Sequence, residues 1–256
     1  MNFQKNTDKL NNVIICDNAR ILGEKAGHKA GELIKAAIKE KGQANIILAT
    51  GASQFETLNT LVKEDIDWSR VVMFHLDEYI GLPESSPASF RKYLRERFIS
   101  KVSQLKAAYL IDGEVDPISE CERLNSIIKE HPIDVALVGI GENGHLAFND
   151  PPADFEIEVP YIIVTLDNEC RQQQFNEGWF KSINDVPGQA ISMSIKQICK
   201  SATIICSVPD NRKARAVKNS LEEKVNNLVP ASILQLHDDC TFYLDRLSSS
   251  LLMRQN

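Results

Sequence analysis

Hydrophobic and polar residues follow two different periods along the chain. Short apolar runs, such as 13–16, 45–50 and 134–140, have the length and the β-branched content of buried strands. Between these runs, apolar residues recur every three to four positions over longer stretches, as they do in amphipathic helices. Strands that alternate with helices in this way predict βαβ units and a mostly parallel sheet that helices cover on both faces.

The clearest of the expected helices follows the strand at 13–16. Asp17 is placed to cap its N-terminus, and Gly42 lies just beyond its end, where glycine commonly terminates a helix. The apolar residues between them repeat with nearly the helical period, so one face of this helix is expected to pack on the sheet. That face comprises Leu22, Ala26, Ala30, Leu33, Ala37 and Ile38.

The same reasoning gives the remaining elements. The segment 77–89 is rich in polar residues and is expected to be a loop. No internal repeat, low-complexity tract or linker interrupts the pattern, so one α/β domain over residues 1–256 with a doubly wound, Rossmann-like fold is predicted. Strands are expected at 45–50, 70–76, 134–140, 161–166, 191–195, 202–208 and 240–244, and helices at 53–63, 90–99, 118–130, from 168 onward and at 210–221.

Composition narrows the class of protein. A net charge of −6 argues against a nucleic-acid partner, which would require a basic face. The polar N-terminus lacks the apolar core of a signal peptide, and no apolar run approaches the length of a membrane helix, so a cytoplasmic protein without a membrane partner is expected. The six cysteines show no CxxC spacing and are expected to be reduced thiols. A small anionic substrate and a homo-oligomer both remain open.

Three predicted strand ends carry residues with possible chemistry. In the first, Thr50, Gly51, Ala52 and Ser53 lead from a strand into a helix. Small residues and a helix N-terminus can bind an anion, although an ordinary tight turn has the same composition and the Walker ending is missing. In the second, Asp77 and Glu78 directly follow an apolar strand. These acids could cap a helix or face solvent, or one of them could be a general base whose pKa is tuned by burial.

The third strand end is the glycine-rich segment 139–152. It contains His145, with Asn143 and Asp150 as possible orienting partners, and Gly141 and Gly144 would let the loop turn tightly beside a ligand. A histidine in such a loop could instead satisfy a backbone carbonyl. No second histidine or cysteine lies nearby at ligand spacing, so no metal site is predicted. Because parallel sheets bind ligands beyond the carboxyl ends of their strands, the three features together predict one pocket.

These residues also support a resemblance to a known family. The segments "FHLDEYIGLP" and "GIGENGHLAFNDP" resemble the glucosamine-6-phosphate deaminases, whose larger group includes the 6-phosphogluconolactonases. The "ATGAS" turn, the "SINDVPGQAISMSI" segment, the "PDNRKARAV" helix start and the "PASILQLHDDCTFYLD" tail extend the likeness over most of the chain. The lactonases usually have an "SLFP"-like run after their Gly-His, so "HLAFNDP" is similar to the deaminase branch.

The resemblance implies a reaction and roles for particular residues. Glucosamine 6-phosphate and water would give fructose 6-phosphate and ammonia without a cofactor. His145 would catalyse opening of the sugar ring, and Asp77 would move a proton between C2 and C1. The segment 50–53 and Gly144 would contact substrate with Glu78 in support, Lys213 would bind the phosphate, and Arg171 is the one arginine in the helix where the family has an active-site arginine.

The sequence departs from the family at the partners of the histidine. Asn143 stands where many deaminases have Asp, and Asp150 stands where they have Glu. The effector-binding segment of some members is not recognisable, so no strong allosteric activation is predicted. The alternatives are a 6-phosphogluconolactonase-type hydrolase, a deaminase of another amino-sugar phosphate such as galactosamine 6-phosphate, and a non-enzymatic sugar-phosphate sensor.

Other conspicuous residues receive ordinary interpretations. His75 is expected to pack behind the site, and His237 is expected to lie in a loop. Trp179 fits a lid over the pocket about as well as it fits the core. The charges at 118–130 are expected to form a solvated helix face.

Overall fold

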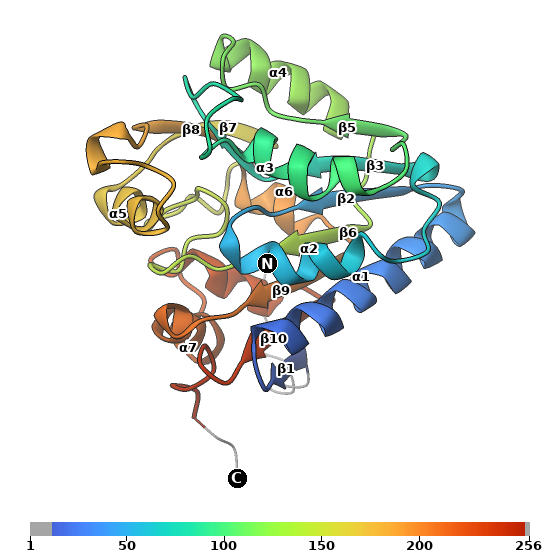
Figure 1. The fold of residues 1–256 in the computed structure, drawn as a ribbon. Coiled ribbons are helices and arrows are strands. Elements are labelled where there is room, and N and C mark those ends of the chain that lie inside the picture. The colour runs from blue at the N-terminus through green and yellow to red at the C-terminus, as the bar shows by residue number, and fades with distance from the viewer. Residues whose placement is uncertain (1–11, 254–256) are drawn as a thin grey trace.

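A computed structural model describes residues 12–253, which are built around a seven-stranded parallel sheet (Figure 1). Each pair of neighbouring strands in this sheet runs parallel. The predicted α/β class is confirmed, and the order of the strands places β6 and β2 near the centre. The order is β1 (Val13–Cys16), β10 (Cys240–Asp245), β9 (Thr203–Val208), β6 (Val135–Val138), β2 (Ala44–Leu48), β3 (Val71–His75) and β5 (Ala107–Tyr109).

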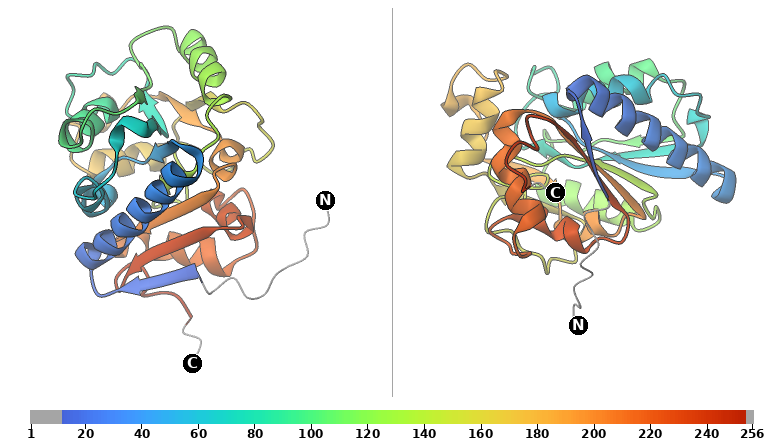
Figure 2. Two further views of the ribbon diagram at one scale, coloured as in Figure 1. Left: turned by 90° about the vertical axis from the view of Figure 1, so that its right-hand side faces the viewer. Right: turned by 90° about the horizontal axis from the view of Figure 1, so that it is seen from below.

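Helices cover both faces of this sheet, as the alternating pattern predicts (Figures 1 and 2). Successive residues of a strand point to opposite faces, so Ile46 and Leu48 of β2 belong to one core while Ile47 between them belongs to the other. The first core is closed by α1 (Ala19–Lys41), α2 (Phe55–Leu61) and α3 (Phe90–Arg97), and the second by α4 (Pro117–Ile128), α6 (Ile195–Cys199) and α7 (Ala214–Glu222).

Helix α1 shows how local sequence sets an element. Its N-cap is Asn18, whose side chain accepts a hydrogen bond from the Ile21 amide, so the expectation that Asp17 caps it is wrong by one residue. Gly42 ends the helix in the left-handed conformation at φ 79°, as predicted. A Cβ at Gly23 would lie 2.2 Å from Cβ of Glu56, so this glycine lets α1 and α2 approach closely.

A second, three-stranded sheet was not expected from the sequence. It consists of β4 (Asp77–Tyr79), β8 (Gln189–Met193) and β7 (Tyr161–Thr165), paired antiparallel in that order. The interpretation of 77–89 as entirely loop is therefore wrong, because a strand of three residues is too short to produce a periodic pattern. Helix α5 (Asn168–Asn176) packs beside this sheet, and their shared core includes Tyr79, Phe148 and Cys170.

Several smaller expectations are corrected. The helix expected at 53–63 begins with a 3-10 turn over Ala52–Gln54, and the one at 210–221 begins with a 3-10 turn over Asn211–Lys213. The charges of α4 do not all face solvent, because Glu120 is buried and accepts a hydrogen bond from the Asp112 amide at 2.7 Å. The strand β5 was not expected.

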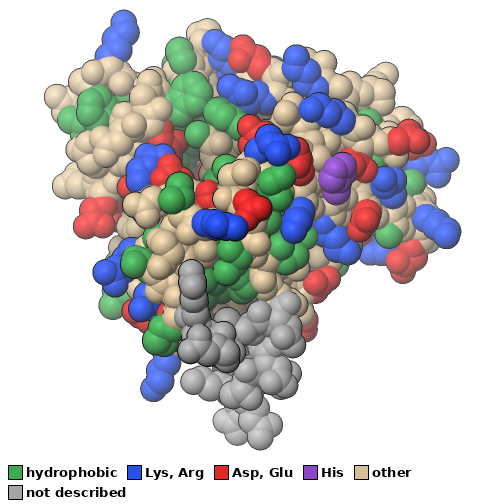
Figure 3. Space-filling model, turned by 60° about the horizontal axis from the view of Figure 1, so that its bottom comes forward, with side chains coloured by type: hydrophobic (Ala, Val, Ile, Leu, Met, Phe, Trp, Pro, Cys, Tyr) green, Lys and Arg blue, Asp and Glu red, His purple; other side chains and the backbone are tan. Residues whose placement is uncertain are grey.

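The surface and the cysteines agree with the composition. On the face shown in Figure 3, Lys and Arg side chains are interspersed with Asp and Glu side chains. All six cysteines lie within the described residues, none of them is in a disulfide, and five are buried. Within residues 12–253, no helix combines the length and the apolar character needed to span a bilayer.

Candidate active site

One cavity of about 380 Å³ lies where the carboxyl ends of the central strands meet. Its walls come from the segments that follow β2, β3, β6 and β9, together with residues of α5. The structure thus brings the three strand ends together at one edge of the sheet, where such folds bind ligands. Of the candidate residues, Thr50, Gly51, Ala52, Ser53, Asp77, His145 and Lys213 line this cavity.

The glycines of the 139–152 loop make room for His145. A Cβ at Gly141 would lie 2.3 Å from both Cε1 and Nε2 of the imidazole, so the ring occupies the space that any side chain at 141 would need. The Gly141 amide also donates to the His145 carbonyl at 3.0 Å, and Gly144 turns the chain with φ at 87°. The loop therefore holds the imidazole flat against its own backbone.

Behind the imidazole, Asp150 organises a polar cluster. Its Oδ1 lies 3.2 Å from His145 Nδ1 and accepts a hydrogen bond from Asn143 Nδ2 at 3.2 Å. Its Oδ2 accepts from the Asp167 amide, also at 3.2 Å, at the start of α5. Burial raises the pKa of Asp150, but the His145 ring and these donors outweigh it, so the pKa stays below its usual value.

Asn143 acts on His145 through the backbone. Its Oδ1 accepts a hydrogen bond from the His145 amide at 3.0 Å, while its Nδ2 reaches Asp150. Asn143 and Asp150 thus form the orienting pair that the sequence suggested, although neither lines the cavity. The carboxylate of Asp150, rather than the amide of Asn143, is the group beside the ring.

Asp77 presents a carboxylate to the cavity without a hydrogen-bond donor of its own among the described residues. It lies at the start of β4, where it pairs with Ser192 of β8. Burial, with a smaller contribution from the neighbouring charge of Glu78, raises the pKa of Asp77 to about 8. A buried carboxyl group with a pKa near neutrality can both accept and return a proton, as a general base must.

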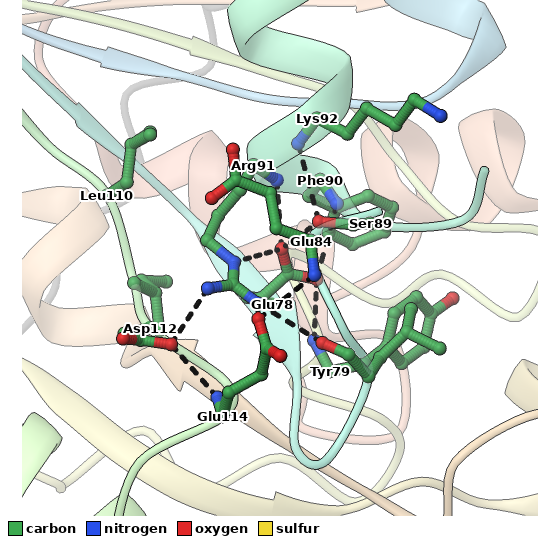
Figure 4. A network of polar contacts seen from close by, with 12 residues as sticks. Glu78, Tyr79, Glu84, Ser89, Phe90, Arg91, Lys92, Leu110, Asp112 and Glu114 are labelled. Atoms are coloured by element: carbon green, nitrogen blue, oxygen red, sulfur yellow. Dashed lines mark hydrogen bonds and ion pairs between the residues drawn. The ribbon is translucent and has the colours of Figure 1, made fainter. Parts of the chain in front are cut away.

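Glu78 faces away from the cavity into a dense polar network (Figure 4). Its carboxylate accepts hydrogen bonds from the amides of Phe90 and Arg91 at 3.2 and 2.8 Å, which are the first amides of α3, and from the Ser89 hydroxyl at 2.9 Å. The Arg91 side chain in turn bridges to Asp112 and Glu114. Glu78 therefore fixes β4 to α3 and holds Asp77 in place without lining the cavity.

The cavity lining also offers cationic and amide donors. The turn after β2 is shaped by Gly51, whose φ of 93° suits glycine and whose carbonyl accepts from the Tyr93 hydroxyl at 2.9 Å. Lys213 is buried in the lining of the same cavity, and its ammonium makes no ion pair or hydrogen bond with the described residues. Burial lowers the pKa of Lys213, while Glu177 and Glu142 oppose that shift.

Several polar residues of the cavity lining were missed by sequence reasoning, among them Arg212, Gln173, Gln174 and Glu177. Arg212 precedes the predicted lysine and pairs with Asp210 at 2.9 Å and Glu142 at 3.3 Å. The other three, Gln173, Gln174 and Glu177, come from α5 and its C-terminal end. Polar residues on a short helix look the same in sequence whether they face solvent or a cavity, so only the placement of α5 reveals them.

Arg171 has a different environment from the one expected. Its guanidinium donates to the carbonyls of Ile183 and Val186, both at 3.0 Å, and it does not line the cavity. Its contacts therefore tie α5 to the segment before β8 and give no support to substrate binding by this residue.

His75, His237 and Trp179 lie outside the cavity lining. His75 is fully buried, and its Nε2 accepts a hydrogen bond from the Ile111 amide at 2.8 Å, so its packing role is confirmed. His237 contacts the Ser201 carbonyl at 2.8 Å, and Trp179 is half-buried after α5.

Comparisons with known proteins agree with this geometry. The model of the family described as glucosamine-6-phosphate isomerases/6-phosphogluconolactonase matches residues 17–243. The glucosamine-6-phosphate deaminase of Oenococcus oeni is 36% identical over 231 residues, which span 90% of this chain and 95% of that protein. The deaminase of Listeria monocytogenes is 37% identical over 241 residues, or 93% and 99% of the two chains.

A solved structure leads to the same group. It was described as a monomeric glucosamine-6-phosphate deaminase, and it matches with a TM-score of 0.85 and 32% identity over 93% of this chain and 99% of its own. The family match extends over most of the described residues and includes the cavity-lining segments that follow β2, β3, β6 and β9. This chain belongs to the glucosamine-6-phosphate isomerase/6-phosphogluconolactonase family.

Proposed function

We propose that the protein is an enzyme that converts glucosamine 6-phosphate and water into fructose 6-phosphate and ammonia. The observation that carries this proposal is the shared cavity of Asp77, whose pKa is raised to about 8, and His145. An aldose–ketose isomerisation needs one group that works at the ring oxygen and another that works at carbon, and the cavity supplies both. The relatives from Oenococcus oeni and Listeria monocytogenes support this proposal, because they are glucosamine-6-phosphate deaminases.

The phosphate is expected at the end of the cavity formed by the 50–53 turn and Lys213. Lys213 is a buried cation that is unpaired among the described residues, and the amides of the turn are further donors for an anion. Arg212 is adjacent, but Asp210 and Glu142 already neutralise its charge. A phosphate bound there would let the sugar reach Asp77 and His145 with its C1 and C2.

His145 opens the sugar ring in this proposal. The imidazole accepts the proton of the anomeric hydroxyl and returns a proton to the ring oxygen, which gives the open-chain aldehyde. Asp150, 3.2 Å from Nδ1, stabilises the ring while it carries both protons and keeps it oriented. The imidazole needs no movement of the backbone, because the glycine-rich loop already holds it in the cavity.

Asp77 then moves the proton that converts aldose to ketose. Its carboxylate removes the proton from C2 while the carbonyl oxygen at C1 gains a proton given up by the ammonium group, which gives an enolamine. The protonated Asp77 then returns its proton to C1, which leaves a protonated imine at C2. Water adds to that carbon to form a carbinolamine, and loss of ammonia gives the ketone of fructose 6-phosphate. The absence of a hydrogen-bond donor to Asp77 among the described residues leaves its oxygens available for both carbons.

A panel of substrates tests this proposal. The purified protein should release equal amounts of ammonia and fructose 6-phosphate from glucosamine 6-phosphate. Galactosamine 6-phosphate and 6-phosphogluconolactone serve as parallel substrates that distinguish another amino sugar and a lactone hydrolase. Release of ammonia from galactosamine 6-phosphate alone would mean that this amino sugar, and not glucosamine 6-phosphate, is the substrate. Turnover of the lactone alone would overturn the proposed reaction.

A further inference from the structure

The fold brings together three potential metal ligands from two separate segments of the chain. His145 and Asp150 come from the glycine-rich loop, and Cys170 comes from the first turn of α5, twenty residues after Asp150. Their ligand atoms all lie within 4.8 Å of one another. We propose that His145 Nδ1, an Asp150 carboxylate oxygen and the Cys170 sulfur form a binding site for a thiophilic divalent cation such as Zn²⁺.

The distances suit such an ion. Zinc binds sulfur at about 2.3 Å and nitrogen or oxygen at about 2.0–2.2 Å in a tetrahedron, which places its ligand atoms about 3–4 Å apart. The nitrogen of His145 and the oxygen of Asp150 are already 3.2 Å apart. The Cys170 sulfur lies within 4.8 Å of both atoms, so it must approach them by about 1 Å at most to complete three corners of the tetrahedron, and water can take the fourth.

The charges also fit a divalent cation. Binding replaces the proton of the Cys170 thiol with the metal and releases that proton to solvent, so the sulfur becomes an anion. The thiolate and the Asp150 carboxylate then neutralise the two positive charges, and the imidazole contributes none. Such a neutral cluster can remain buried at low cost, and Cys170 and His145 are both buried.

The nature of the ligands selects the class of ion. Sulfur and imidazole favour Zn²⁺, Co²⁺ and Cd²⁺, whereas Mg²⁺ and Ca²⁺ require sites built from oxygen ligands. The start of α5 adds a favourable dipole at the anionic sulfur, because the Cys170 amide is in the first turn and donates to Asp167 at 2.6 Å. The site is therefore specific in chemistry as well as in geometry.

Binding at this site has a consequence for turnover that rests on the proposed function. A metal on Nδ1 of His145 takes the place of the stabilising contact with Asp150 and makes the opposite nitrogen a poorer base. The ion would thus inhibit the enzyme reversibly by binding Nδ1 of the His145 imidazole. Substrate could still enter, because the metal lies behind His145 and neither Asp150 nor Cys170 lines the cavity.

Cobalt is the most direct probe, because it reports its ligands by absorption. The reduced, metal-free protein should bind one equivalent of Co²⁺ with a thiolate-to-cobalt charge-transfer band in the near ultraviolet, and Zn²⁺ should abolish that band by displacement. Cys170→Ser, which keeps the size and the hydrogen-bonding capacity of the side chain, should lose the band and weaken Zn²⁺ binding at least tenfold by calorimetry, because loss of even a group that only orients a metal ligand typically costs about 10–100-fold.

The matched control is Cys199→Ser, because Cys199 is the more exposed thiol and lies at the end of α6. This variant should bind Co²⁺ as the parent does. His145→Gln removes a second ligand and should also weaken binding, which keeps the test decisive if Cys170→Ser does not fold. A band that persists without Cys170, a band lost with Cys199, or no band at all would overturn the site. These measurements use no substrate, so they are independent of the proposed reaction.

Discussion

The position of His145 depends on the absence of a side chain at Gly141. The imidazole lies where a side chain at Gly141 would be, and an oxygen of Asp150 lies 3.2 Å from its Nδ1. At Asp77 the surroundings offer burial and a neighbouring acid instead of a donor, which raises the pKa of this carboxyl group to about 8. The two catalytic candidates are thus tuned by packing at the level of single residues.

Gly141→Ala tests whether the imidazole needs the space that the missing side chain at position 141 leaves free. A methyl group would lie 2.3 Å from two ring atoms, so His145 must move out of its position. We expect kcat/KM for glucosamine 6-phosphate to fall by about 10²-fold or more, the usual range for loss of a general acid–base group. Gly188→Ala is the control, because a Cβ there meets no atom within 4 Å and should leave activity within a few-fold of the parent. Equal effects of the two substitutions would contradict this role of Gly141.

His145→Gln separates ring opening from isomerisation. Glutamine keeps a polar side chain of similar reach but cannot carry a proton between two oxygens. We therefore expect kcat/KM to fall much more for the cyclic substrate than for an open-chain analogue that needs no ring opening. Equal losses with both compounds would remove His145 from the ring-opening step.

At the scale of elements, α5 connects the parts of the site. Gln173 accepts a hydrogen bond from the Glu142 amide in the glycine-rich loop at 2.8 Å, and Gln174 accepts one from the Tyr79 hydroxyl of β4 at 2.8 Å. Figure 1 shows α5 beside the small sheet, and Arg171 fastens it to the segment before β8. The position of α5 therefore affects both catalytic strand ends.

Arg171→Ala tests whether this arginine stabilises the position of α5 or binds the substrate. Losing two hydrogen bonds from a charged donor to backbone carbonyls should lower the free energy of unfolding by about 2 kcal/mol. Well below the melting temperature, KM for glucosamine 6-phosphate should stay within a few-fold of the parent value. The exposed Arg215 of α7 supplies the control Arg215→Ala, which should leave stability unchanged. A tenfold rise in KM without loss of stability would instead favour substrate binding by Arg171.

At the scale of the whole molecule, Asp77 links folding to pH. Its pKa is 3.8 in the reference state and about 8 in the folded protein, so between these values the folded state binds more protons than the unfolded one. The free energy of unfolding contributed by this group therefore falls as pH rises from about 4 to 8, by at most about 1.4 kcal/mol per pH unit. Conversely, kcat/KM should rise toward pH 8 as the base form of Asp77 appears.

Asp77→Asn should remove the loss of stability that Asp77 causes as pH rises. The variant lacks the titrating group, so its melting temperature should exceed that of the parent at pH 8, and the difference should shrink as pH falls toward 4. Thermal melts of both proteins across that range measure the effect, and the other titrating groups largely cancel in the comparison. A difference that is independent of pH would mean that the pKa of Asp77 is not raised in the folded protein.

Much of the fold could be predicted from the pattern of apolar and polar residues. The strands that were not predicted are all too short, or too dependent on tertiary contacts, to leave such a pattern. Runs such as 13–16 and 134–140 are long enough to show their period, and each corresponds to a strand of the parallel sheet. The three-residue strands β4 and β5 are too short to show one. The separate antiparallel sheet depends on tertiary contacts between β4, β8 and β7 that no local pattern contains.

The same division applies to the site. His145, Asp77 and the 50–53 turn could be predicted because distinctive residues follow apolar runs directly, and all of them line the cavity. Arg212 and Gln174 could not, because their neighbours are set by packing of α5 and α7. Cys170 lies in an ordinary polar helix in the sequence, and only the fold places it beside Asp150.

The central claim is that Asp77 moves the proton in a reaction that releases ammonia, and one paired measurement tests it. Ammonia and fructose 6-phosphate are quantified from glucosamine 6-phosphate with the parent and with Asp77→Asn, and binding of the substrate to each is measured by calorimetry. The account predicts equal product amounts from the parent, and about 10²–10⁴-fold slower turnover with retained binding in the variant. Near-normal turnover by Asp77→Asn, or a parent that binds the substrate and releases no ammonia, would contradict it.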